Sequence, residues 1–218
     1  MQVKLISSTS PCGELKSQGI ESAEDIIVYC ARVSNPNNQL NVDTGDKLVN
    51  YCIKHEHWSI FEHASLTVEI KTSRAIAAQI LRHRSFTFQE FSQRYSPAQT
   101  IEPYELRRQA EKNRQSSSDV ISDNENGVFE VAKRAIEAAQ YAYNTLLERG
   151  VARECARMFL PLTTQTTMYM TGTCRSFIHY INLRTKVDTQ KEHRVIAESV
   201  KDIFSAVFPL TSKALGYN

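Results

Sequence analysis

The sequence predicts an α+β fold in which an antiparallel sheet is flanked by helices and the C-terminal half of the chain is mainly helical. Two patterns carry this prediction. Within residues 62–73 apolar and polar side chains alternate, as in a strand with one buried face, whereas from residue 129 onward apolar side chains recur every three or four positions. A chain of 218 residues can bury one continuous core, so we expect a single domain spanning residues 1–218.

The N-terminal third contains signals for both strands and helices. Residues 1–15 alternate apolar and polar side chains, which is typical of an edge strand rather than of a signal peptide. Ser22 and Asp25 have the spacing of a capping box and predict a helix that begins just after Ser22. A second short helix is predicted by Leu48, Val49, Cys52 and Ile53.

Four helices are predicted in the C-terminal half. The first begins near Phe129 and ends near Gly150, a residue typical of a helix C-terminus. The second covers 152–159 and stops before Pro161, and the third covers 174–184. The last carries an apolar face before Pro209, formed by Ile196, Val200, Ile203 and Val207.

Residues 104–127 are polar and nearly free of large apolar side chains, so this segment cannot bury much core. We expect it to be a mobile surface excursion. No other segment is biased enough in composition to mark a domain boundary.

Charge and cysteine content restrict the class of protein. Lys and Arg total 26 against 24 for Asp and Glu, so no global field favours nucleic acid or an anionic membrane. The five cysteines are odd in number and lack CxxC spacing, which favours the reducing cytoplasm. Cys155 and Cys174 lie in apolar helical patterns, where we expect a cysteine to act as a small core residue.

The densest concentration of chemically active side chains lies within residues 79–95. Arg82, Arg84 and Arg94 fall in this segment, and guanidinium groups bind phosphate oxygens in a bidentate manner. Aromatic residues interleave with the charged ones, which indicates that the segment is partly buried and that its charges need partners. The sequence therefore favours a site for a phosphorylated ligand over a solvated basic helix face.

Three other kinds of site are less favoured. The arginine cluster and its aromatic neighbours could bind single-stranded nucleic acid, but the nearly neutral chain argues against that. Ser92 lies in no GxSxG elbow, which argues against a serine hydrolase. His55, His57 and His63, with Glu56 and Glu62, reproduce no known zinc spacing, so no metal site is expected.

Arg82-His83-Arg84, followed after seven residues by Ser92, resembles the signature of the flavin-dependent thymidylate synthases. Four further blocks resemble that family in the same order, at residues 31–34, 57–63, 153–162 and 175–184. Thr173 and Asp188 depart from residues found at the flavin site of some members. The resemblance covers most of residues 24–210 and implies a thymidylate synthase complementing protein-like domain.

The resemblance implies a methyltransferase that converts dUMP to dTMP, with FAD as cofactor and with methylenetetrahydrofolate and NADPH as co-substrates. It further implies a homotetramer whose active sites are shared between subunits. Arg184 would be the catalytic cation that stabilises negative charge on the uracil ring. The residues implied in FAD binding are Ser34, His57, Ser59, Glu62, Arg82, His83, Arg84, Glu90, Arg175 and His179. Those implied in dUMP binding are Gln79, Arg82, Glu90, Phe91, Ser92, Gln93, Arg94, Arg157 and Arg184.

Overall fold

The protein contains a four-stranded antiparallel sheet. The computed structural model describes residues 1–97, 100–122, 125 and 127–217. Within them the strand order is β1-β2-β6-β3, which leaves β1 at one edge as expected. The strands are β1 (Gln2–Ser8), β2 (Ser65–Ser73), β3 (Thr87–Glu90) and β6 (Gln165–Thr173). A separate pair consists of β4 (Arg107–Gln109) and β5 (Ser117–Val120).

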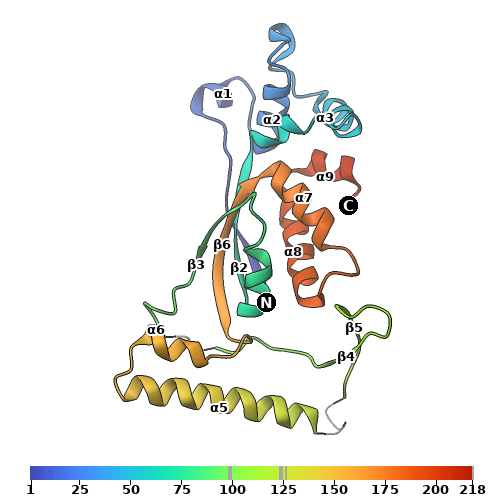
Figure 1. The fold of residues 1–218 in the computed structure, drawn as a ribbon. Helices are drawn as coiled ribbons and strands as arrows, with labels where there is room; N and C mark the ends of the chain where they lie inside the picture. Colours follow the sequence, from blue (N-terminus) through green and yellow to red (C-terminus); the bar gives the residue numbers. More distant parts are fainter. Residues whose placement is uncertain (98–99, 123–124, 126, 218) are drawn as a thin grey trace.

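Helices lie beside the sheet and at both of its ends (Figure 1). The longer C-terminal helices α7 and α8 lie along one side of the sheet, with α9 nearby, whereas α5 and α6 lie at the opposite end from α1, α2 and α3. The α-helices are α1 (Gly13–Ser17), α2 (Ala23–Ala31), α3 (Gly45–Lys54), α4 (Arg74–Ile80), α5 (Val128–Glu148), α6 (Arg153–Ala156), α7 (Cys174–Arg184), α8 (Lys191–Val207) and α9 (Pro209–Leu215). The 3₁₀ segments are η1 (Pro36–Asn38), η2 (Trp58–Glu62) and η3 (Arg157–Phe159).

The alternation in β2 produces one buried face, as predicted. Leu66, Val68 and Ile70 are at most 1% exposed. The opposite face is polar, and on it the hydroxyl oxygens of Thr67 and Thr171 lie 2.9 Å apart across the β2–β6 pair. In the described part of the chain, the hydrophobic core therefore covers one face of the sheet.

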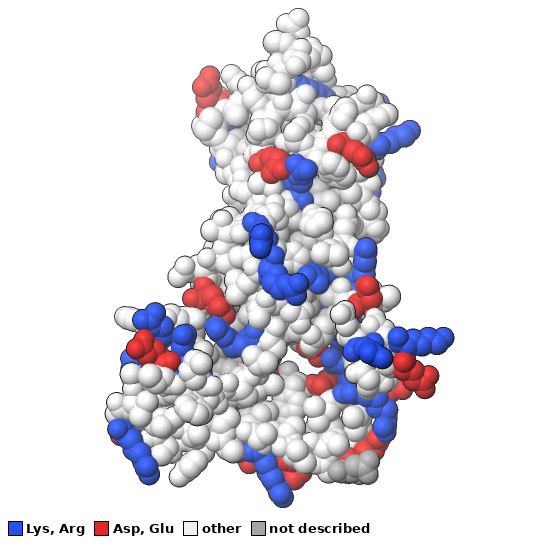
Figure 2. Space-filling model, viewed as in Figure 1, with Lys and Arg blue, Asp and Glu red and all other residues white. Residues whose placement is uncertain are grey.

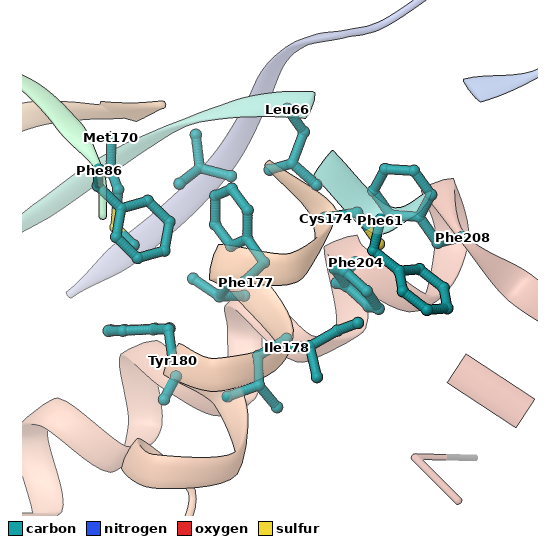
Figure 3. Close-up of a cluster of buried hydrophobic side chains, with 14 of the residues drawn as sticks. Phe61, Leu66, Phe86, Met170, Cys174, Phe177, Ile178, Tyr180, Phe204 and Phe208 are labelled. Carbon is teal, nitrogen blue, oxygen red and sulfur yellow. The ribbon is translucent and has the colours of Figure 1, made fainter. Parts of the chain in front are cut away.

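Aromatic side chains from α7 join the sheet to the helices (Figure 3). Phe177 is fully buried, and its ring centroid lies 4.9 Å from that of Phe86 in an edge-to-face arrangement. Burying a side chain of this size stabilises the folded state by about 1.5–3 kcal/mol. Because Phe86 follows the Arg-His-Arg motif by two residues, this contact holds the turn 82–86 against the core.

Two helices begin where a strand ends, and the last strand residue caps each of them. The Ser73 hydroxyl accepts a hydrogen bond from the N–H of Ile76 at the start of α4, and Thr173 accepts one from Ser176 at the start of α7. The capping box predicted for Ser22 and Asp25 is confirmed at the start of α2. Local sequence therefore fixes where these helices enter the fold.

The long helix α5 confirms the prediction of a helix from Phe129, but it is less buried than its apolar stripe suggests. Among the residues of α5, only Tyr143 is buried. The chain then forms α6 and η3 in place of one continuous helix over 152–159. Cys155 is exposed, so its expected role as a core residue is wrong, because α6 lies at the edge of the molecule; Cys174 is buried as expected.

The polar segment 104–127 carries the pair β4–β5, apart from residues 123, 124 and 126, which lie outside the described residues. Its side chains are mostly exposed. Arg107 forms an ion pair of 2.6 Å with Glu192, and Lys191 one of 2.7 Å with Glu105, and these pairs join the segment to α8. Its mobility stays a prediction.

In the part of the chain that the structure describes, no helix has both the length and the apolar character needed to cross a membrane.

Gly172→Ala should destabilise the protein by about 1–3 kcal/mol, because it overpacks the contact between β6 and the turn. A Cβ atom at Gly172 would lie 2.4 Å from Cδ1 of the Phe86 ring. Urea unfolding measures the change. Gly13→Ala is the matched control, since no atom lies within 4 Å of a Cβ there. Equal stability of the two variants would contradict the tight contact.

Candidate functional site

The Arg-His-Arg motif forms a turn between α4 and β3, which we call the Arg-His-Arg turn (residues 82–84). His83 is 8% exposed, whereas Arg82 and Arg84 are exposed. Within the described residues, neither of these two arginines forms an ion pair. Figure 2 shows Lys and Arg side chains gathered at the middle of the face where α4 and α7 lie in Figure 1. The turn therefore presents cations that are available to an anionic ligand.

The His83 side chain packs against residues of α7. Its ring lies 5.0 Å from that of Tyr180, and Arg184 Nε donates a hydrogen bond of 2.9 Å to His83 Nε2. Burial, followed by the charges of Arg184, His179 and Arg82, lowers the pKa of His83 to about 4. The imidazole is therefore neutral, with its proton on Nδ1, and Arg184 remains charged beside it.

Only the Nε atom of the Arg184 guanidinium group donates a hydrogen bond to another described residue. Within the described residues, no hydrogen bond engages its two terminal nitrogens, and the side chain is half-buried. A half-buried arginine with free donors can stabilise negative charge on a bound molecule.

A pocket of about 260 Å³ lies where β3 ends and η3 begins, and we call it the Arg157 pocket. Two of its buried nitrogens, Gln93 Nε2 and Arg157 Nε, have no hydrogen-bond partner among the described residues. Buried donors without partners are costly, and an anion would satisfy them. The pocket is lined by Arg74, Gln93, Arg157, Met158, Leu160, Pro161 and Leu162.

Glu90 lies at the end of β3 and is fixed by two neighbours. Arg74 Nη1 donates to its carboxylate at 2.7 Å, and Thr166 Oγ1 donates to the same oxygen at 2.9 Å. Arg74 also lines the Arg157 pocket, so it connects Glu90 to that pocket. Arg74 was not predicted as a site residue, because it is a single arginine at the start of an apolar helix and belongs to no motif.

Three predicted residues near this pocket are exposed. Phe91 is 39% exposed and Ser92 is exposed. Arg94 lies in an exposed ion pair of 3.3 Å with Glu154. An exposed pair of this kind contributes little to stability, so Arg94 can exchange its partner for a ligand.

A third set of predicted residues lies around η2 and the start of α7. Arg175 forms an ion pair of 2.9 Å with Glu62, which also accepts a hydrogen bond of 3.0 Å from Thr173 Oγ1. The exposed His57 ring lies 5.8 Å from the Tyr51 ring. Ser59 is exposed in η2, and His179 is exposed on α7.

Ser34 lies apart from the other sets, in an open pocket on the α2–α3 side. This pocket has a volume of about 510 Å³ and is also lined by Arg32 and Lys47. Arg32 has a structural role, since its side chain donates hydrogen bonds to the backbone oxygens of Asn38 and Asn41.

One chain does not bring all of the predicted residues together. Arg175 and Arg184 lie near the two ends of α7, roughly 14 Å apart at 1.5 Å per residue. Within the described residues, no hydrogen bond or ion pair links the Arg157 pocket to the Arg-His-Arg turn or to Glu62. Among all the residues that the structure describes, no group of three His, Cys, Asp or Glu side chains is arranged to hold a metal ion.

Comparison with known proteins connects these features to one family. Residues 17–210 match the family described as thymidylate synthase complementing protein. The chain is 51% identical over its full length to a probable flavin-dependent thymidylate synthase of Paramecium bursaria Chlorella virus 1, all of which is covered. It is 49% identical to the flavin-dependent thymidylate synthase of Synechocystis sp., with 99% of each chain covered. It is also similar to the crystal structure of a UMP/dUMP methylase, PolB from Streptomyces cacaoi, bound with 5-Br dUMP. The TM-score is 0.83 and the identity 27%, with 99% of this chain and 94% of that chain covered.

Proposed function

The chain belongs to the flavin-dependent thymidylate synthase family, and from this premise we propose how its own residues convert dUMP to dTMP. The reaction is a flavin-dependent methyl transfer to dUMP, and its assignment rests on the family match and the two relatives. The observation that supports the placement of the nucleotide is the Arg157 pocket, where buried nitrogens of Gln93 and Arg157 lack partners in the part of the chain that the structure describes. We assign the 5′-phosphate of dUMP to this pocket.

The phosphate-binding set includes a residue beyond those expected from sequence. Arg157 and Arg94 supply cationic donors, and Gln93 supplies an amide donor. Arg74 adds positive charge to the pocket and holds Glu90 through its ion pair of 2.7 Å. Ser92 and Phe91, which lie beside Gln93 in the chain, complete the assigned contacts.

The uracil ring is assigned to Gln79, Glu90 and Arg184. Arg184 stays charged and offers two terminal nitrogens, so it stabilises negative charge that develops on the ring during methyl transfer. Its hydrogen bond to neutral His83 fixes the direction of the guanidinium group. Positioning and electrostatics are therefore the main tasks of the protein.

The exposed arginines of the Arg-His-Arg turn fit a flavin dinucleotide, because its phosphates need cationic donors. We assign FAD to Arg82, His83, Arg84 and Glu90. Bound by these residues and reduced, FAD would supply the hydride that completes the methyl group. Further FAD contacts are assigned to Ser34, His57, Ser59, Glu62, Arg175 and His179. NADPH as reductant, methylenetetrahydrofolate as carbon donor and a cytoplasmic location complete the proposal.

We further propose a homotetramer with shared active sites. The separation of the site residues on one chain supports this arrangement, and so does the weakly buried stripe of α5. Large apolar side chains lie exposed near α5, α6 and η3, which is typical of a subunit interface. They include Tyr95, Val131, Tyr141, Met158, Phe159 and Leu162.

The visible absorption spectrum of the purified protein tests the proposal. Protein supplied with FAD should retain flavin bands, and anaerobic NADPH should bleach them. A change in the bleaching rate on adding dUMP would place the nucleotide beside the flavin. Absence of bound flavin would reject the proposed cofactor site.

Ser92→Ala should keep measurable turnover, within about tenfold of the parent, because losing one hydroxyl contact costs about 0.5–1.5 kcal/mol. Ser92 is exposed and makes no side-chain hydrogen bond to a base within the described residues. Steady-state dTMP formation and the Kd for dUMP measure the effect. Complete loss of turnover with normal dUMP affinity would point to a covalent role for Ser92 and contradict the assignment.

A further inference from the structure

A buried histidine beside the Arg-His-Arg turn has no role in the assignments above. His193 on α8 is 0% exposed, and its ring lies 6.2 Å from that of His83. Its Nδ1 lies 3.3 Å from Oε1 of Gln79, and its Nε2 lies 3.2 Å from the hydroxyl of Tyr180. Burial, followed by the charge of Arg184, lowers the pKa of His193 to about 3. The ring is therefore neutral and carries one proton.

A hydrogen-bond chain that ends at a carboxylate shows which end of the Gln79 amide is the nitrogen and which is the oxygen. Glu192 forms an ion pair of 2.6 Å with Arg107, and its other oxygen accepts a hydrogen bond of 2.9 Å from Gln190 Nε2. Since a carboxylate only accepts, the Gln190 amide must direct its nitrogen toward Glu192. Its oxygen then accepts a hydrogen bond of 2.7 Å from Gln79 Nε2.

The same reasoning shows which nitrogen of His193 carries the proton. Because Nε2 of Gln79 faces Gln190, Oε1 faces His193, and Nδ1 of His193 must donate. The neutral ring then has an acceptor at Nε2, which receives the hydroxyl proton of Tyr180. Each hydrogen bond between Tyr180 and Glu192 in this chain therefore has a defined donor and a defined acceptor. His193 is the link that holds the carbonyl end of the Gln79 amide.

We propose that His193 is a positioning residue for nucleotide recognition, which holds the Gln79 amide in the orientation that matches uracil. This rests on the proposed function, which assigns Gln79 to dUMP. One amide N–H and one carbonyl lone pair of Gln79 remain available. Uracil offers an N–H and a carbonyl oxygen on adjacent ring positions, whereas cytosine offers a ring nitrogen acceptor and an amino donor. A fixed amide selects the first pattern and rejects the second.

Equilibrium binding of dUMP and dCMP to the FAD-loaded protein tests this role. His193→Leu keeps an apolar side chain of similar size but removes both hydrogen bonds. We expect its Kd for dUMP to rise about tenfold and its preference for dUMP over dCMP to fall about tenfold. His193→Asn can still donate toward Gln79, so it should retain most of the preference. Unchanged preference in His193→Leu would overturn the proposal.

A double variant distinguishes action through Gln79 from a general loss of packing. His193→Leu combined with Gln79→Ala should bind dUMP no more weakly than Gln79→Ala alone. Phe204→Leu is the matched control: Phe204 lies on the same helix and is equally buried, but it makes no contact in this chain of hydrogen bonds. It should lower stability without changing the preference.

The outcomes separate this inference from the proposed function. If Gln79→Ala weakens dUMP binding and His193→Leu does not, the inference fails alone. If Gln79→Ala leaves dUMP binding unchanged, the assignment of Gln79 fails and the inference fails with it. Should His193→Leu not fold, Tyr180→Phe replaces it, because it removes the hydrogen bond that holds Nε2 of His193. Tyr180→Phe should weaken the preference in the same direction, and an unchanged preference would overturn the inference.

Discussion

Arg184→Ala should retain FAD but lose roughly 100- to 1,000-fold in turnover, which is the usual effect of removing one donor that stabilises transition-state charge. The Nε atom of Arg184 is used on His83, so the two terminal nitrogens are the groups that serve the substrate. The loss should appear mainly in kcat, because the charge they stabilise develops during the reaction. Steady-state kinetics with saturating dUMP measure it.

Two control variants narrow the interpretation of that loss. Arg184→Lys keeps a positive charge but cannot donate to His83 and the substrate in the same way, so its activity should be intermediate. Lys186→Ala, two residues further along the chain and exposed, should match the parent. Full activity in Arg184→Ala would reject the catalytic assignment, and loss of bound FAD would assign Arg184 to the cofactor instead.

Glu24→Ala should reduce the free energy of unfolding by about 3 kcal/mol, because it leaves several buried donors without an acceptor. The Glu24 side chain on α2 accepts hydrogen bonds from the N–H groups of Leu210 and Thr211 at 2.8 and 2.7 Å. It also accepts one of 2.6 Å from the Thr211 hydroxyl, and Glu24 is only 2% exposed. One carboxylate thus joins α2 to the start of α9.

Urea unfolding of the protein free of ligands measures that change. Glu24→Gln keeps one acceptor oxygen and should lose less stability than Glu24→Ala. Glu14→Ala, in the exposed helix α1, is a control expected to change stability by less than about 0.5 kcal/mol. Equal stability of Glu24→Ala and the control would show that the contact between α2 and α9 contributes little.

Helices and strands whose apolar side chains recur at regular spacing were predictable, because this spacing indicates which side chains are buried. β2 alternates between core and solvent along its length, and α7 begins and ends at the predicted residues. Ser22 was informative for a local reason, since a capping box depends only on neighbouring residues. In each case the signal and the structure that it predicts lie within one short segment.

β6 was missed because its sequence is rich in threonine and places Tyr169 between Met168 and Met170, so it lacks the apolar alternation of β2. Only its pairing with β2 and β3 makes it a central strand, and such long-range pairing leaves little trace in a single sequence. Arg74 and His193 were missed for the same reason. The first becomes informative beside Glu90 and the second beside Gln79, contacts made only after folding.

Formation of dTMP tests the central claim most directly. The FAD-loaded protein is incubated anaerobically with dUMP, methylenetetrahydrofolate and NADPH, and the nucleotides are separated by chromatography. We expect dTMP and tetrahydrofolate in equal amounts with the complete mixture, and no dTMP when NADPH or methylenetetrahydrofolate is omitted. Absence of dTMP from the complete mixture, with flavin bound and reduced, would contradict the assignment.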